Sequence, residues 1–216
     1  MKRISAKTDE IINSSTHAVG IGLSIVALVL MIVRALVYGT TAAVVGGAVF
    51  GAGMIVLYTA STIFHATKRW RLKYQLNKFD HSAIYVLIAA TYTPITLVTL
   101  GGVWGWTVFG IVWAMALAGI IFKVFFYTAK YRLISTIAYI AMGLVIVIAL
   151  EPLIESMPLW GLVWMGIGGV SYMAGAMFYL VKNVPLMHGI FHLFVLGGSF
   201  SHFWAIYHYV LPVSIL

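Results

Sequence analysis

Three histidines and one aspartate fall where apolar, helix-length segments begin or end: His65, Asp80, His188 and His192. His188 and His192 are four residues apart, so on a helix their imidazoles project from one face, about one turn apart. Two histidines at this spacing commonly bind one metal ion. His65 would supply a third nitrogen, and three protein ligands with an open fourth position are typical of catalytic zinc. The pattern predicts an intramembrane zinc site.

Two further residues could take part in chemistry at this site. We expect Asp80 either to bind the metal directly or, preferably, to hold a water there and accept its proton. Ser61 lies one turn before His65 on the same helix face and could hydrogen-bond a ligand or a substrate carbonyl. In the alternative interpretation, each residue is an amphipathic side chain at the membrane interface. Ionisable residues within apolar spans are functional-site candidates by default, which favours the metal site.

Composition places the chain among integral membrane proteins. Of its 216 residues, 62% are hydrophobic and only 8% are charged, and the mean hydropathy is +1.04. A soluble domain of this length does not need so much apolar surface. Cysteine is absent, which excludes thiolate ligands and thiol catalysis. The formal charge of +8 lies beside the apolar segments, so it indicates membrane topology, and no nucleic-acid partner is expected.

The elements that must position these residues are transmembrane helices. Seven apolar segments are long enough to cross a bilayer, which predicts one all-α domain over residues 1–216, a seven-helix bundle. The predicted spans lie near residues 18–38, 42–65, 80–100, 104–126, 132–151, 158–181 and 188–211. We expect residues 5–16 to form a separate short helix at the membrane surface, and Pro94 to kink the third span.

Charge predicts the orientation of the bundle. Lysine and arginine gather before the first span and between spans two and three, four and five, and six and seven. With seven spans all these places share one side, which predicts a cytoplasmic N-terminus and an outer C-terminus. The expected location is the inner (plasma) membrane, which the chain crosses several times. His65, Asp80, His188 and His192 would then share one depth, near the inner boundary of the bilayer.

The remaining histidines are interpreted by their distance from this site. His202 lies ten residues beyond His192, about 15 Å along a helix, so it cannot share the same metal. We expect it to make a buried hydrogen bond in the bundle or a polar contact in a substrate cavity. For His17 an interfacial position is preferred over a place beside the ligands, and His81 is expected to face the basic loop.

Several motifs, taken together, are similar to one known family. They are N-S-S-T-H at 13–17, S-T-I-F-H at 61–65, F-D-H-S-A-I-Y at 79–85, T-Y-T-P at 91–94 and H-G-I-F-H-L-F-V-L-G-G-S at 188–199. Over essentially its whole length the chain resembles the hemolysin III family. This family is the bacterial branch of the progestin and adipoQ receptor superfamily, which includes the adiponectin receptors.

The resemblance implies seven helices, a cytoplasmic N-terminus and an intramembrane zinc ion held by three histidines. By motif these ligands correspond to His65, His188 and His192. Asp80 matches the aspartate that contacts the water on the zinc, and Ser61 matches the family serine. The superfamily is linked with hydrolysis of lipid amide or ester bonds, ceramide-like in the receptor branch, and the bacterial branch with cytolysis and membrane lipid homeostasis.

Three functions are consistent with these features. We favour a zinc-dependent lipid hydrolase of the inner membrane, with a membrane lipid as its partner and Asp80 as general base. The second is a membrane-perturbing or pore-forming protein in which zinc is structural. The third is a lipid-sensing, receptor-like bundle without turnover. The long soluble N-terminal region of the receptor branch has no counterpart in this sequence, so no extracellular protein ligand is expected. The lipid and the oligomeric state are not predicted.

Overall fold

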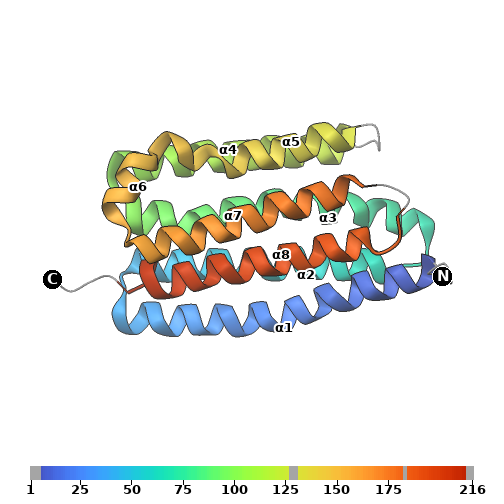
Figure 1. Cartoon of the computed structure of the whole chain (residues 1–216), viewed down its shortest axis with the longest axis horizontal. Helices are drawn as coiled ribbons and strands as arrows, with labels where there is room; N and C mark the ends of the chain where they lie inside the picture. The colour runs from blue at the N-terminus through green and yellow to red at the C-terminus, as the bar shows by residue number, and fades with distance from the viewer. Residues whose placement is uncertain (1–5, 127–130, 182–183, 213–216) are drawn as a thin grey trace.

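The computed structural model describes residues 6–126, 131–181 and 184–212, and over these ranges the chain is helical and contains no strand (Figure 1). Seven of the helices described there are long and apolar enough to cross a membrane, which confirms the predicted fold class. The elements are α1 (Ala6–Tyr38), α2 (Thr41–Ala66), α3 (Trp70–Pro94), η1 (Ile95–Leu100), α4 (Gly102–Phe126), α5 (Arg132–Gly143), η3 (Val145–Ala149), α6 (Leu150–Ser156), α7 (Leu159–Leu180), α8 (Met187–Ala205) and η4 (Ile206–Val210).

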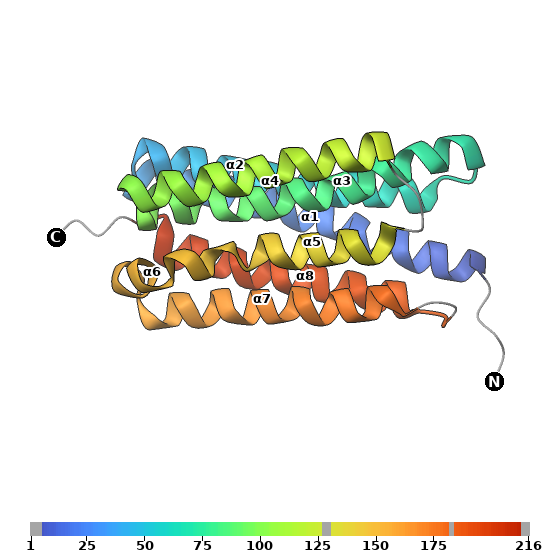
Figure 2. The same cartoon turned by 90° about the horizontal axis from the view of Figure 1, so that it is seen from above.

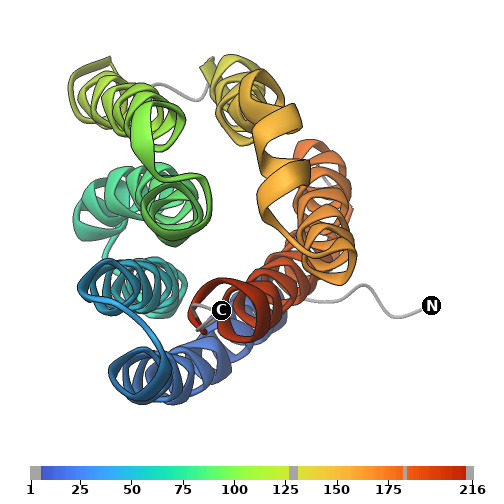
Figure 3. The same ribbon diagram turned by 90° about the vertical axis from the view of Figure 1, so that its left-hand side faces the viewer.

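The helices run roughly side by side along the long axis of the molecule (Figures 1 and 2). Seen end-on, α1 to α4 follow one another along one side, and α5, α7 and α8 complete the other (Figure 3). Consecutive helices pack together, and α8 returns to contact α1. One end of the bundle, where α1, α3 and α8 begin and α2 ends, is called the site end below. It gathers segments that are far apart in the sequence.

At the site end two helices are longer than the predicted spans. The polar residues 5–16, expected to form a short helix at the membrane surface, belong to α1, which continues unbroken from Ala6 to Tyr38. The third span was predicted near residues 80–100, and α3 starts earlier, at Trp70. In both cases apolar content locates the membrane-crossing part, while a polar helical extension keeps the same backbone hydrogen bonds beyond it. The site therefore lies inside continuous helices.

Close packing of α2 on α3 depends on glycine. A Cβ atom at Gly46 would lie 2.7 Å from the Cα atom of Pro94, and one at Gly53 would lie 2.5 Å from the Cβ atom of Ala90. Only a hydrogen at these positions allows the two backbones to approach. At Pro94 the α-helix changes to the π-helical turn η1, which is the form that the predicted irregularity takes. The close contact keeps the end of α2 beside α3.

The fifth span is interrupted near its middle. The α-helical hydrogen bonds of α5 end at Gly143, and the chain continues through η3 into α6. The Tyr92 hydroxyl donates to the Gly143 carbonyl oxygen at 2.6 Å and accepts from the Ile146 amide at 3.0 Å. A side chain inserted between donor and acceptor satisfies backbone groups that the membrane could not. The span is therefore continuous in its hydrogen bonding although its helix is not.

Candidate metal centre

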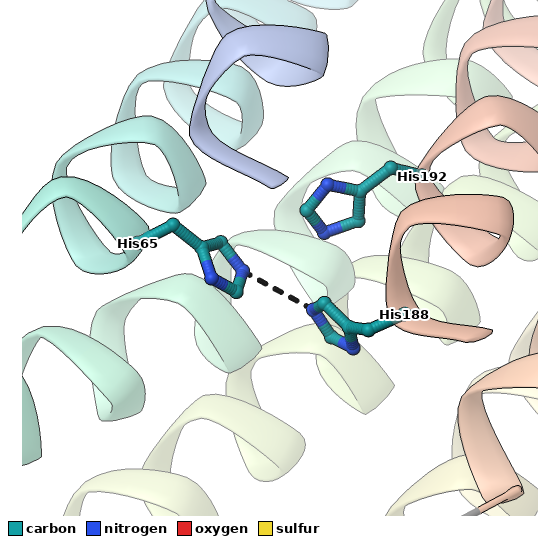
Figure 4. A group of neighbouring side chains, drawn as sticks. All are labelled: His65, His188 and His192. Atoms are coloured by element: carbon teal, nitrogen blue, oxygen red, sulfur yellow. Dashed lines mark hydrogen bonds between the residues drawn. The ribbon is translucent and has the colours of Figure 1, made fainter. Parts of the chain in front are cut away.

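Three imidazoles from α2 and α8, which are far apart in the sequence, meet at the site end. His65 lies in the last turn of α2, and His188 and His192 lie in the first two turns of α8. Each offers one ligand atom, and the three atoms all lie within 4.8 Å of one another. The Nε2 atoms of His65 and His188 are 3.1 Å apart, and Figure 4 shows the three rings turned toward one another. The three histidines are close enough to hold one metal ion.

Local backbone structure orients the two histidines of α8. Leu186 directly precedes the helix and has a φ of +67°, and it is the one non-glycine residue with positive φ in the described part of the chain. This uncommon conformation turns the incoming chain sharply. One helical turn then separates His188 from His192, and their ring centroids are 4.6 Å apart. Both imidazoles face the last turn of α2, where His65 lies.

Hydrogen bonds determine which nitrogen of the His65 and His192 rings is free to bind a metal. The Nδ1 atom of His65 lies 2.7 Å from Oε2 of Glu10, and Nδ1 of His192 lies 3.2 Å from the Asn13 carbonyl oxygen. Since a carboxylate and a carbonyl oxygen only accept, each Nδ1 carries the proton. The Nε2 atoms keep their lone pairs for a metal. This is the arrangement that a first-row metal bound by imidazole requires.

Asp80 and Ser61 lie beside the three histidines. Both are buried, and their side chains are within hydrogen-bonding reach of each other. Both line the same cavity as His188 and His192. Asp80 is not part of the group whose ligand atoms lie within 4.8 Å. Of the two roles predicted for Asp80, this position favours holding a proton near the metal over ligating it.

A cavity of about 180 Å³ leads from the histidines into the bundle. His188 and His202 both line it, and they are fourteen residues apart, which is about 21 Å along α8. Most of the other lining side chains are apolar and come from several helices, among them Leu57, Ile84, Leu87, Ile140, Met173 and Val195. A long cavity whose surface is mostly apolar suits a molecule with an alkyl chain.

The structure corrects the predictions for two other histidines. His17 is buried and stacks on His192, with ring centroids 3.6 Å apart and planes at 12°, so it is not interfacial. His81 does not face the basic loop: it is buried, its Nε2 lies 3.1 Å from the Tyr179 hydroxyl, and it lines the cavity. Both errors concern packing between helices. The turn of α1 that holds His17 packs against His192 of α8, and His81 of α3 faces Tyr179 of α7.

The prediction for His202 is confirmed. The side chain is buried, its Nδ1 donates to the Gly198 carbonyl oxygen at 2.8 Å, and it lines the cavity. Its ring also stacks on Tyr172 at 5.3 Å. His202 therefore supplies the cavity with a polar group far from the three histidines.

The contact between Glu10 and His65 is not predicted from the sequence. Besides His65, the Glu10 carboxylate contacts Lys73, with Oε1 2.7 Å from Nζ. The signal was present in the spacing: Glu10, Asn13 and His17 recur at intervals of three and four, which places them on one helix face. The prediction of a surface helix for residues 5–16 places Glu10 and Asn13 away from the metal centre, so the sequence analysis does not include these contacts.

Comparison with known proteins identifies the family of this chain. The family model described as "Haemolysin-III related" matches residues 5–203. The chain belongs to the haemolysin III-related family. It is 44% identical to "Hemolysin-3" of Bacillus cereus over 206 residues, 95% of this chain and 94% of the relative. It is 43% identical to "Hemolysin-3 homolog" of Bacillus subtilis (strain 168) over 208 residues, covering 96% and 97%.

A more distant relative links this haemolysin III-related protein to the progestin and adipoQ receptor superfamily. The chain is 30% identical to "Monocyte to macrophage differentiation factor" of Homo sapiens over 173 residues, 75% of this chain and 69% of the relative. The predicted family is therefore confirmed. Seven apolar spans and these relatives make the protein a multi-pass membrane protein, and the bacterial inner membrane fits as its location.

Proposed function

We propose that this haemolysin III-related protein is a zinc-dependent hydrolase that cleaves an amide or ester bond of a membrane lipid. The observation that carries the proposal is the meeting of three imidazoles, two of them buried and one half-buried, with a buried carboxylate beside a long, mostly apolar cavity. Three neutral nitrogen ligands with room for a fourth suit zinc, and a closed four-ligand structural site would need another donor. The orientation predicted from charge would put the site near the cytoplasmic leaflet, where lipid carbonyls lie.

The cavity would bind the lipid by its alkyl chain. Insertion of the chain between the apolar side chains removes its surface from lipid and water and places the carbonyl at the site end. Ser61, one helical turn from His65, would donate a hydrogen bond to that carbonyl or keep Asp80 oriented. The apolar lining also excludes bulk water, so that the hydrogen bonds at the reacting group are not weakened by solvent.

Asp80 would move the proton in the reaction. A bound zinc ion supplies Lewis acidity, which polarises the carbonyl and makes a neighbouring water a stronger nucleophile. Asp80 takes a proton as the water oxygen forms a bond to the carbonyl carbon. It returns that proton to the leaving nitrogen or oxygen as the C–N or C–O bond breaks. The products are a fatty acid and an amine or alcohol.

The test combines metal analysis with product detection. We expect wild-type protein, purified in detergent, to hold one zinc per chain and to release fatty acid from one class in a panel of ceramides, other N-acyl lipids and ester phospholipids. His188→Ala and His192→Ala should lose both properties. His208→Ala is the matched control, because His208 lies in η4, at the opposite end of the bundle, among aromatic side chains. Full zinc retention by either ligand variant, or zinc-loaded wild type that releases no product, would contradict the proposal.

The names of the bacterial relatives favour a second candidate, a protein that permeabilises membranes and uses the metal for structure. The surface of the cavity is mostly apolar, which counts against an ion pathway, because an ion would need a mostly polar lining. Leakage of dye from liposomes distinguishes the two. Leakage that persists in His188→Ala and His192→Ala would favour the second candidate, whereas hydrolysis without leakage would favour the first.

A further inference from the structure

The beginning of α1 forms one wall of the metal centre. Glu10, Asn13 and His17 lie on one face of the helix, and each contacts a histidine of the centre. These contacts join the first helix to the end of α2 and the start of α8. None of the three residues belongs to the predicted ligand set, so their part in the centre is separate from ligation.

The contact of Glu10 is the most directional of the three. One carboxylate oxygen faces Nδ1 of His65 at 2.7 Å and the other faces Nζ of Lys73 at 2.7 Å. Because both oxygens are engaged, the carboxylate cannot rotate without losing a charged partner. It therefore holds the His65 ring in one orientation and in the tautomer whose proton is on Nδ1. The metal-facing Nε2 is left as an acceptor.

His192 is held on two sides by the same helix. The Asn13 carbonyl oxygen accepts from Nδ1, and the His17 ring covers one face of the imidazole at 3.6 Å. Gly189 permits this approach, because a Cβ atom there would lie 3.2 Å from Cγ2 of Ile12 and 3.3 Å from Oδ1 of Asn13. The start of α8 is thus packed directly on the second and third turns of α1.

We propose that Glu10 is a positioning residue that orients His65 for metal binding, and that the segment of α1 from Glu10 to His17 holds the ligand histidines in place. A carboxylate that accepts from the outer nitrogen of a ligand histidine fixes the ring and makes the inner nitrogen a better donor. Lys73 keeps this carboxylate in place from the neighbouring helix. The inference rests on the metal site of the proposed function, and it does not require turnover.

The test compares metal affinities of the full-length protein. Zinc affinity is measured by competition with a chromophoric chelator, and the ligand field is followed by the visible spectrum of the Co²⁺-loaded protein. We expect Glu10→Ala to weaken zinc binding by about 10- to 100-fold and to shift the cobalt bands. Glu10→Gln should lose less, because its amide oxygen can still accept from His65. Asp9→Asn, which removes the same charge one residue away, is the matched control and should bind like wild type.

Stability and activity are measured in parallel so that each outcome has one meaning. Metal-free Glu10→Gln should unfold close to the wild-type temperature, because the ion pair with Lys73 that it loses is partly exposed and contributes little to stability. Its zinc affinity then reports positioning alone. Wild-type affinity in Glu10→Gln and Glu10→Ala, an equal loss in Asp9→Asn, or a wild type that binds neither zinc nor cobalt would overturn the inference. Weakened binding in the Glu10 variants, with a wild type that hydrolyses no lipid, would support the positioning role and refute the hydrolase.

Discussion

Replacing Asp80 by asparagine separates proton transfer from metal binding. The two side chains have nearly the same shape, so asparagine can occupy the buried position and remain within reach of Ser61. Asparagine cannot accept a proton. The three histidines, whose ligand atoms lie within 4.8 Å of one another without Asp80, are untouched by the change. The variant should therefore keep its zinc and lose hydrolysis.

The magnitude follows from the role assigned to Asp80. General acid–base catalysis by a positioned side chain contributes about 100- to 10,000-fold, or roughly 3–5 kcal/mol of activation free energy. Zinc stoichiometry should stay at the wild-type value. If Asp80 were a ligand instead, its loss would lower zinc occupancy together with activity.

The assay measures release of fatty acid by mass spectrometry and zinc by elemental analysis on the same purified sample. Asp9→Asn serves as the control for removing a negative charge from the site end. Asp80→Asn protein that hydrolyses lipid at the wild-type rate would refute the assignment of a base. Asp80→Asn protein that loses its zinc would refute the placement of Asp80 outside the ligand set.

Three further predictions concern stability, measured by thermal unfolding in detergent. Gly168→Ala puts a Cβ atom 2.2 Å from Nδ1 of His202, so the imidazole must move. Its hydrogen bond to the Gly198 carbonyl oxygen should then be lost, which should lower the free energy of unfolding by about 1–3 kcal/mol. Gly169→Ala is the control and should unfold like wild type, because nothing lies within 4 Å of its Cβ atom. Tyr92→Phe removes the hydroxyl that bridges the interruption of the fifth span and should cost about 1–3 kcal/mol, while Tyr38→Phe, on an exposed residue, should be neutral. Removing zinc with a chelator should lower the unfolding temperature, since zinc at 100 times its dissociation constant stabilises the folded state by about 2.7 kcal/mol. An unchanged unfolding temperature in Gly168→Ala or Tyr92→Phe would contradict the importance of the corresponding hydrogen bonds. An unchanged unfolding temperature after chelation would contradict zinc binding.

The features that the sequence predicts well are those recorded in short, regular patterns. Seven apolar runs locate seven spans because each must match the thickness of the bilayer. The spacing of His188 and His192 predicts a shared face because helix geometry is fixed. The meeting of His65 with that pair followed from their common depth, which the basic loops indicated.

Other features depend on packing, which a single sequence does not record. Hydropathy could not show that α1 extends past its apolar run and packs His17 against His192, or that His81, inside the predicted third span, faces Tyr179 of α7. The contact of Glu10 with His65 joins residues 55 positions apart, and no local pattern states which carboxylate reaches which ring. The break after Gly143 depends on a tyrosine from another helix. Such features follow from which helices become neighbours.

The histidine centre also constrains how the protein is made. Its ligands come from α2 and α8, so a helix made early and a helix made late must both be in place before the three imidazoles can face one another. A nascent chain that has not yet inserted α8 has only His65 of the three. Metal capture at this position would then be among the final steps of biogenesis, and a bound ion would mark a completed bundle.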